Sequence, residues 1–167
     1  MGLSNEAGPV EPDRSRQLAA ARTDASPEDL TKLATDPVVA IRAMVATHPS
    51  CPPQILHQLA QDRAWAVRAG VARNLAASPD TLAVLVQDSD LLVRRKLAGH
   101  PAIPLDLLTA LALDSSHSVR QTVIANPNVV PELLILLLQD PDPRIRQTAA
   151  GHPMCPAHVR ALARMID

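Results

Sequence analysis

The sequence of 167 residues is almost devoid of aromatic side chains, with one Trp and neither Tyr nor Phe. Proteins that bind single-stranded nucleic acid usually offer several rings on which bases stack, so this scarcity argues against that class. The 16 basic and 17 acidic residues also nearly cancel, whereas a nucleic-acid binder normally has a net basic face. We therefore do not expect nucleic acid as a partner.

Long apolar runs and cysteines are scarce as well. The longest apolar run, residues 133–138, is far shorter than the roughly 20 residues that a membrane-spanning helix needs. The segment "MGLSNEAGPVEPDRSR" lacks the basic start and apolar core of a signal peptide. Two cysteines do not make a disulfide framework. These absences predict a cytoplasmic protein without membrane contact.

Motifs of catalysis are missing too. The sequence has only five glycines and contains no Gly-rich phosphate loop, no HExxH and no nucleophile elbow. We expect no catalytic residues, no cofactor and no enzymatic activity.

The sequence does contain a repeat of 26 residues without insertions. Each copy has an Asp, an Arg six residues later, and a His or Asn after six more. We call each set of equivalent polar residues a ladder. The three ladders are Asp36, Asp62, Asp88, Asp114, Asp140; Arg42, Arg68, Arg94, Arg120, Arg146; and His48, Asn74, His100, Asn126, His152, with Arg16 one unit upstream. Such self-similarity is typical of repeat architectures.

Each copy is predicted to form two short helices. In "SPEDLTKLATD", Ser26 suits the N-cap and Pro27 the first helical position. The repeated Asp is expected to cap the second helix, with Pro37 and Pro141 at its first position. The His-Pro or Asn-Pro pair ends it, because a residue before proline disfavours the α conformation.

The apolar positions recur on one face of each expected helix. They are Leu30/Leu33, Leu56/Leu59, Leu82/Leu85, Leu108/Leu111 and Leu134/Leu137 in the first helices, and Ile41/Val45, Val67/Val71, Val93/Leu97, Val119/Val123 and Ile145/Ala149 in the second. Helices this short are unstable alone in water. They must bury these faces against neighbouring copies, so residues 14–167 are predicted to form an all-α solenoid of about five and a half units.

The two ends depart from the repeat. Residues 1–13 are expected to form a disordered tail. The last helix, "PAHVRALARMID", has Arg160 and Ala163 at the core positions of the repeat. This is typical of a capping unit, and we expect it to end the solenoid.

The segment "LTKLATDPVVAIRAMVATHPSCPP" resembles the signature of the leucine-rich repeat variant family, L..LA.D....VR..VA.NP..P, which is related in style to HEAT repeats. The resemblance covers roughly residues 15–165. It implies a right-handed superhelix of alternating helices without β-sheet. Some family members carry an N-terminal iron–sulfur module with clustered cysteines, but no cysteine precedes Cys51 here, so that activity does not carry over.

The Asp and Arg ladders have two interpretations. Six residues along a helix correspond to 240° around it, so Asp36 and Arg42 should not face each other. A structural contact would then join adjacent copies, as the similar ladder of HEAT repeats is understood to do. The alternative is a row of arginines that grips an anionic polymer. Because nearly every arginine has an acidic counterpart, we favour the structural interpretation.

The His and Asn ladder, with Cys51 and Cys155 nearby, suggests a metal site. Packed helices lie about 8–10 Å apart, so histidines in alternate copies should be about 20 Å apart, whereas zinc binds its ligands at about 2 Å. Both residue types can also bond to loop backbone. We therefore predict a structural ladder and no metal, with a dimer-shared metal as the alternative. The two cysteines, four repeats apart, are too distant for a disulfide.

Variable positions are where a repeat protein holds its specificity. Three residues after each Asp stand Val39, Trp65, Leu91, His117 and Pro143. Our hypothesis is a protein-binding surface made of Val39, Trp65, Leu91, Leu92 and Arg95; the rival is that these residues pack under the neighbouring copy.

The predicted function is a non-catalytic protein-interaction scaffold, a monomer or weak dimer whose partner is another protein. The alternative is a binder of nucleic acid or another anionic ligand through a basic groove.

Overall fold

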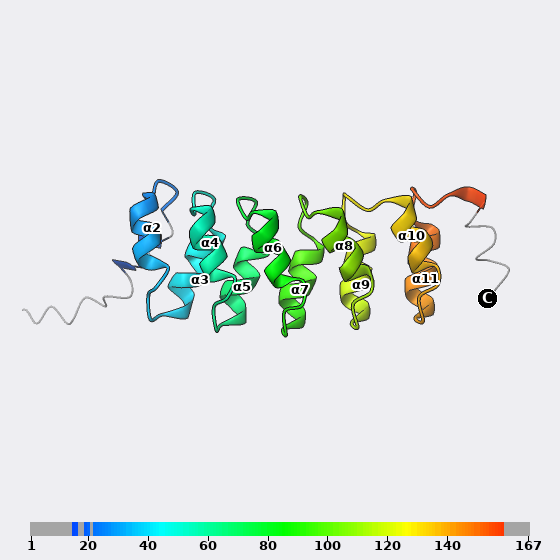
Figure 1. Cartoon of the computed structure of the whole chain (residues 1–167), viewed down its shortest axis with the longest axis horizontal. Coiled ribbons are helices and arrows are strands. Elements are labelled where there is room, and N and C mark those ends of the chain that lie inside the picture. Colours follow the sequence, from blue (N-terminus) through cyan, green and yellow to red (C-terminus); the bar gives the residue numbers. More distant parts are fainter. Residues whose placement is uncertain (1–14, 17–18, 21, 159–167) are drawn as a thin grey trace, which may run out of the picture.

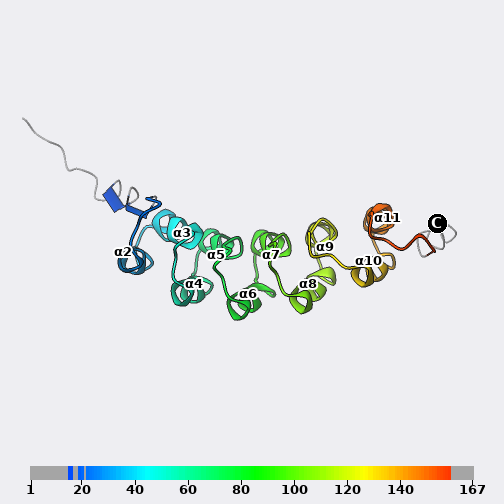
Figure 2. The same cartoon turned by 90° about the horizontal axis from the view of Figure 1, so that it is seen from above.

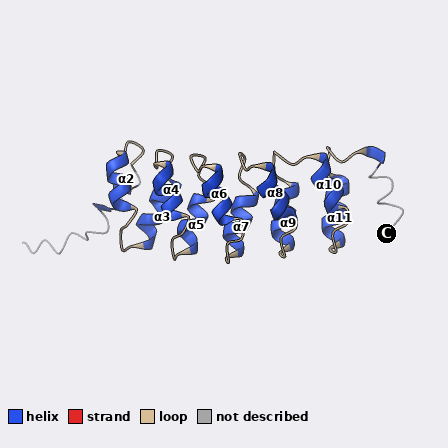
Figure 3. Cartoon of the chain, in the orientation of Figure 1, coloured by secondary structure: helices blue, strands red, loops and turns tan. Residues whose placement is uncertain are grey.

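The computed structural model describes residues 15–16, 19–20 and 22–158, and this part of the chain contains ten α-helices between Pro27 and Gly151 and no strands (Figures 1 and 3). The first helix of each pair is α2 (Pro27–Leu33), α4 (Pro53–Leu59), α6 (Pro79–Leu85), α8 (Leu105–Ala112) or α10 (Pro131–Leu137). The second is α3 (Val39–Thr47), α5 (Trp65–Val71), α7 (Leu91–Ala98), α9 (His117–Ile124) or α11 (Pro143–Gly151). The all-α solenoid is confirmed. The expected tail, 1–13, and the cap positions Arg160 and Ala163 lie outside the described residues.

The ten helices form two layers, seen end-on in Figure 2. One layer holds the first helices and the other holds the second helices, and each second helix contacts the next second helix along the array. The array bends gently, with the second helices on its inner side. We call the exposed surfaces of these layers the first-helix face and the second-helix face.

The core runs between the two layers along the whole array. The leucine pairs of the first helices are buried apart from Leu33, which is partly buried, and so are all the aliphatic pairs of the second helices. Small residues at one second-helix position, Ala46, Ala72 and Ala98, are fully buried. The apolar period therefore identified the core correctly, because a helix of seven to nine residues has no other way to remove its apolar face from water.

Helix α3 approaches α5 closely at Gly70. A Cβ atom on Gly70 would lie 2.9 Å from the Cβ of Ala46 and 3.2 Å from the Cγ2 of Thr47. Glycine is therefore needed here for lack of space.

Helix α2 begins as predicted, and the second helices do not. The Ser26 hydroxyl accepts the backbone N–H of Asp29, and Pro27 begins α2. By contrast, Asp36 is not the N-cap of α3: its carboxylate accepts the N–H of Val38 at 2.8 Å in a tight turn, and α3 begins at Val39.

The predicted helical positions of Pro37 and Pro141 are therefore wrong, since both lie before their helices. The physical reason is that an Asp side chain readily bonds the backbone two residues on. In α7 and α11 the cap is instead a second Asp, Asp90 or Asp142, which accepts the N–H two residues later.

Candidate interaction surface and the ladders that position it

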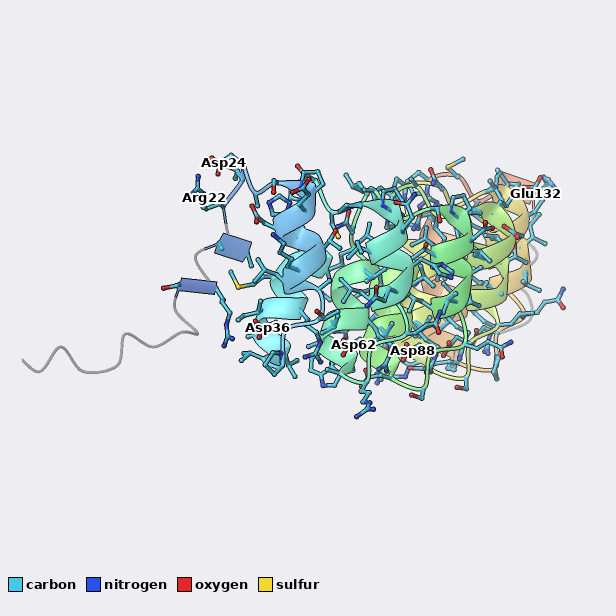
Figure 4. The ribbon with its side chains drawn as sticks, turned by 60° about the vertical axis from the view of Figure 1, so that its left-hand side comes forward. Arg22, Asp24, Asp36, Asp62, Asp88 and Glu132 are labelled. Atoms are coloured by element: carbon cyan, nitrogen blue, oxygen red, sulfur yellow. The ribbon has the colours of Figure 1, made fainter. Side chains whose placement is uncertain are left out.

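One long edge of the solenoid carries the Asp and Arg ladders (Figure 4 labels three of the aspartates). The Nε and Nη2 of Arg42 donate to the two carboxylate oxygens of Asp62 at 2.7 and 3.0 Å. The Nη1 of the same guanidinium donates to the carbonyl oxygen of Asp36 at 2.7 Å. One arginine thus binds a side chain of the next repeat and the main chain of its own repeat.

The same arrangement continues along the edge. Arg68 pairs with Asp88, Arg94 with Asp114 and Arg120 with Asp140, with Nε–Oδ2 distances of 2.6, 2.7 and 2.6 Å. Upstream, Arg16 lies 3.1 Å from Asp36. Each of these pairs joins two adjacent repeats, which fixes the spacing of the helices between them.

The side chains of Asp36 and Arg42 do not pair with each other, as expected, but the main-chain carbonyl of Asp36 does reach the guanidinium. An angle of 240° between the two residues holds only for a helix that runs from the Asp through the Arg, but α3 begins only at Val39. The turn before the helix brings the carbonyl of Asp36 to the guanidinium, while the carboxylate of Asp36 faces Arg16.

Four of the aspartates of this edge, Asp62, Asp88, Asp114 and Asp140, are held in the charged form. A hydrogen bond from Arg42 is the main reason that the pKa of Asp62 is lowered. At Asp88, Asp114 and Asp140 burial alone would raise the pKa, but the arginine hydrogen bonds, a backbone N–H and the nearby positive charges together lower it. The four carboxylates are consequently ionised at neutral pH and neutralised by their arginines.

The opposite edge carries the His and Asn ladder, which bonds to main chain. In His48, Nδ1 accepts the N–H of Ser50 at 3.1 Å, and Nε2 lies 2.7 Å from the carbonyl oxygen of Arg22, one repeat upstream. Because Nδ1 is an acceptor here, the proton must be on Nε2, which donates to that carbonyl. The imidazole is therefore neutral in this arrangement.

Asparagine makes the same two links. Asn74 accepts the N–H of Ala76 through its side-chain oxygen and donates to the carbonyl oxygens of Ala46 and His48 at 2.8 and 2.9 Å. Further along, His100 and Asn126 repeat the two patterns. His152 accepts the N–H of Met154 in the same way.

The cysteines near this edge are core residues. Cys51 and Cys155 are buried thiols at the repeat position that Ile103 and Val129 fill elsewhere. Burial raises the pKa of the Cys51 thiol to about 11, so it is protonated at neutral pH and a poor metal ligand. Within the described residues, no three His, Cys, Asp or Glu side chains are grouped to hold a metal.

The candidate interaction residues stand at the start of the second helices. Val39, Trp65 and Leu91 are the first residues of α3, α5 and α7, and their side chains are 41%, 48% and 40% exposed. We call these three the apolar row. Beside it, Leu92 is half-buried and Arg95 is exposed.

The row ends where the repeat position loses its large apolar residues. His117 and Pro143, the first residues of α9 and α11, are also exposed. The ladder edge lies next to the row, because each row residue follows three positions after a ladder Asp. The ion pairs that fix the repeats therefore also fix the spacing of the row.

A comparison with protein families identifies the repeat. The family model described as "Leucine rich repeat variant" matches residues 39–64 and 65–90. A solved structure described as a leucine-rich repeat variant with a novel repetitive protein structural motif is 27% identical, with a TM-score of 0.68 over 92% of this chain. Residues 39–90 therefore match the leucine-rich repeat variant family, and the fold of the chain is similar to that of the solved variant. The chain spans 66% of the length of that solved protein, just under two thirds. No curated protein matches it.

Several exposed apolar residues of these variant repeats escaped the sequence analysis. Leu75 is 70% exposed, Leu113 is 68% exposed and Leu105 is 50% exposed. Two of them interrupt the repeat: Leu75 stands where the other copies have Pro after the ladder residue, and Leu113 where two neighbouring copies have Gln. That interruption was the available signal. No two of the three occupy the same repeat position, so they do not extend the apolar row.

Across the described part of this variant-repeat array, no helix is long and apolar enough to cross a membrane.

Proposed function

We propose that this chain is a non-catalytic protein-interaction scaffold that binds another protein through the apolar row. The observation that supports the proposal is the alignment of Val39, Trp65 and Leu91 at one repeat position on three adjacent helices, each at least 40% exposed. Aligned exposed apolar residues on neighbouring elements often mark protein-binding surfaces.

The chemistry of the row fits an interface. Tryptophan is enriched among residues that contribute most to binding, because a large rigid ring buries much area and loses little rotamer freedom. Trp65 is the only aromatic residue of the chain. The core and both ladders place it at a fixed distance from Val39 and Leu91, so the surface is formed before a partner arrives and little entropy is lost on binding.

A capture experiment with matched variants tests the role. The purified chain, Trp65→Ala and Leu75→Ser serve as baits in an extract of the native host, and bound proteins are quantified by mass spectrometry. Leu75 is the control, because it is an exposed apolar residue outside the row. We expect a partner that the unchanged chain and Leu75→Ser retain and Trp65→Ala loses. Equal recovery by all three baits would contradict the proposal, provided that circular dichroism shows all three folded.

The single tryptophan also gives a direct optical test. We expect its emission to be that of a solvent-accessible indole, quenched by iodide in the free chain and protected once the captured partner is added. Quenching that is unchanged by the partner would place the interface elsewhere.

A further inference from the structure

Charged side chains are segregated between the two layers of the solenoid. The five second helices contain no Asp or Glu, although they contain eight cationic residues. The five first helices contain no Arg and a single Lys, Lys32. Their acidic residues are Glu28, Asp29, Asp80, Asp106 and Glu132. A net charge of −1 therefore hides two faces of opposite sign.

The ladder does not account for the positive face. Its aspartates lie in the loops and neutralise the ladder arginines there. Four other cations on or directly after the second helices, Arg73, Arg95, Lys96 and Arg144, are exposed and form no ion pair with any residue that the structure describes. Their charge is available to a partner.

Helix stability does not account for the absence of acidic residues from the second helices either. An acidic residue in the first turn stabilises a helix by interaction with its dipole, and four of the five first helices have one. None of the five second helices does. In α3, α5 and α7 the first position is taken by the apolar row instead. The second helices themselves thus carry no acidic side chain, and the negative charges nearest to them, Asp90 and Asp142, stand at the N-caps of α7 and α11.

We propose that the second-helix face binds an extended, acidic segment of a partner protein, with apolar side chains seated on the apolar row and carboxylates over Arg95 and Lys96. This inference rests on the proposed function and specifies the partner's chemistry. Arg95 lies one helical turn from Leu91 on α7, so an anionic side chain next to an apolar anchor on Leu91 would reach Arg95.

The spacing of the row favours an extended segment. Packed helices lie about 8–10 Å apart, and a polyproline II segment, with about 3.1 Å per residue and three residues per turn, brings every third side chain back to the same side at about 9 Å. A segment with an apolar residue at every third position would therefore meet Val39, Trp65 and Leu91 in turn. The bend of the array places this face on its inner side (Figure 2).

The test measures binding of synthetic peptides to the full chain. The probe is a fluorescently labelled peptide of four Leu-Glu-Pro triplets, followed by anisotropy. The two comparison peptides replace every Glu by Lys or every Leu by Ser. We expect both replacements to weaken binding about tenfold or more, because one removes the charge complementarity and the other the apolar anchors.

Matched variants locate the binding site. We expect the double substitution Arg95→Glu/Lys96→Glu to lower the affinity for the Leu-Glu-Pro peptide about tenfold, since surface charges at the rim of an interface change affinity in this range. Trp65→Ala should weaken it as well. The control is Lys32→Glu, which reverses one charge at an exposed site of the other face, half the charge change of the double substitution, and should leave the affinity unchanged.

Each other outcome overturns the inference in a recognisable way. If the Lys peptide binds as tightly as the Glu peptide, the acidic chemistry is wrong. If a twelve-residue oligothymidylate binds more tightly and depends on Arg95 but not on Trp65, the ligand is a nucleic acid. If the chain dimerises in sedimentation through Arg95, the occupant is a second copy. If no peptide binds while the host partner is still captured through Trp65, the scaffold role stands and this inference fails.

Discussion

The two long edges of the solenoid link the same repeats in different ways. On one edge, an arginine binds the carboxylate of the next repeat through Nε and Nη2, and only its Nη1 donates to main-chain carbonyls. On the other edge, a neutral His or Asn binds main chain on both sides. The charged link needs two matching side chains, whereas the neutral link needs only one, since every residue supplies a carbonyl. This explains why Asp and Arg are the same in all five copies while His and Asn alternate.

The largest effect on stability should come from acid, which protonates the aspartates of the charged edge. The pKa values of Asp62, Asp88, Asp114 and Asp140 are lowered in the fold. Their contribution to stability is therefore complete above the pKa of an unfolded Asp, about 3.9, and is lost as the pH falls below it through the folded values. Thermal melts followed at 222 nm should show Tm falling by roughly 10 °C or more between pH 5 and pH 2.5. A flat Tm over this range would contradict the ladder as a source of stability.

Removal of one charged partner should have the next largest effect. Arg94→Ala leaves the carboxylate of Asp114 and the carbonyl of Asp88 without the guanidinium that binds both. We expect the free energy of unfolding to fall by about 2–4 kcal/mol, measured by urea denaturation. The control is the next residue: Arg95→Ala, exposed on the second-helix face, should change it by less than about 0.5 kcal/mol. If both variants lost the same free energy of unfolding, the ladder arginine would be no more important for stability than an exposed arginine of the second-helix face.

These two arginines also show what the sequence could and could not predict. The 26-residue period separates Arg94 from Arg95, and it identified buried residues such as Leu56 and Val67, because the apolar period follows directly from helix geometry. It misplaced the start of α3, because the preference of Asp for helix caps was outweighed by the turn that Asp36 forms with Val38. The opposite charge of the two faces was hidden as well, since net charge counts ladder pairs and surface charges alike.

On the neutral edge, truncation should cost less than on the charged edge. His100→Ala leaves the N–H of Ala102 and the carbonyl of Asn74 without their partner. Unsatisfied buried polar groups cost about 1–3 kcal/mol, and no uncompensated charge is left behind, so we expect a loss of about 1–2 kcal/mol in the same urea assay. A loss larger than that of Arg94→Ala would reverse the order of the two edges.

The smallest effect is expected from exchanging one neutral link for the other. In His100→Asn, the side-chain oxygen would accept the N–H of Ala102 and the amide would donate to the carbonyl of Asn74, as Asn126 does one repeat downstream with Asn128 and His100. We expect stability within about 0.5–1 kcal/mol of the unchanged chain. The parallel exchange on the charged edge, Arg94→Lys, should lose most of the link, because a lysine has no planar fork to bind Asp114 and the carbonyl of Asp88 together. If His100→Asn costs as much as His100→Ala, the neutral edge requires its imidazole, and the alternation of His and Asn would need another cause.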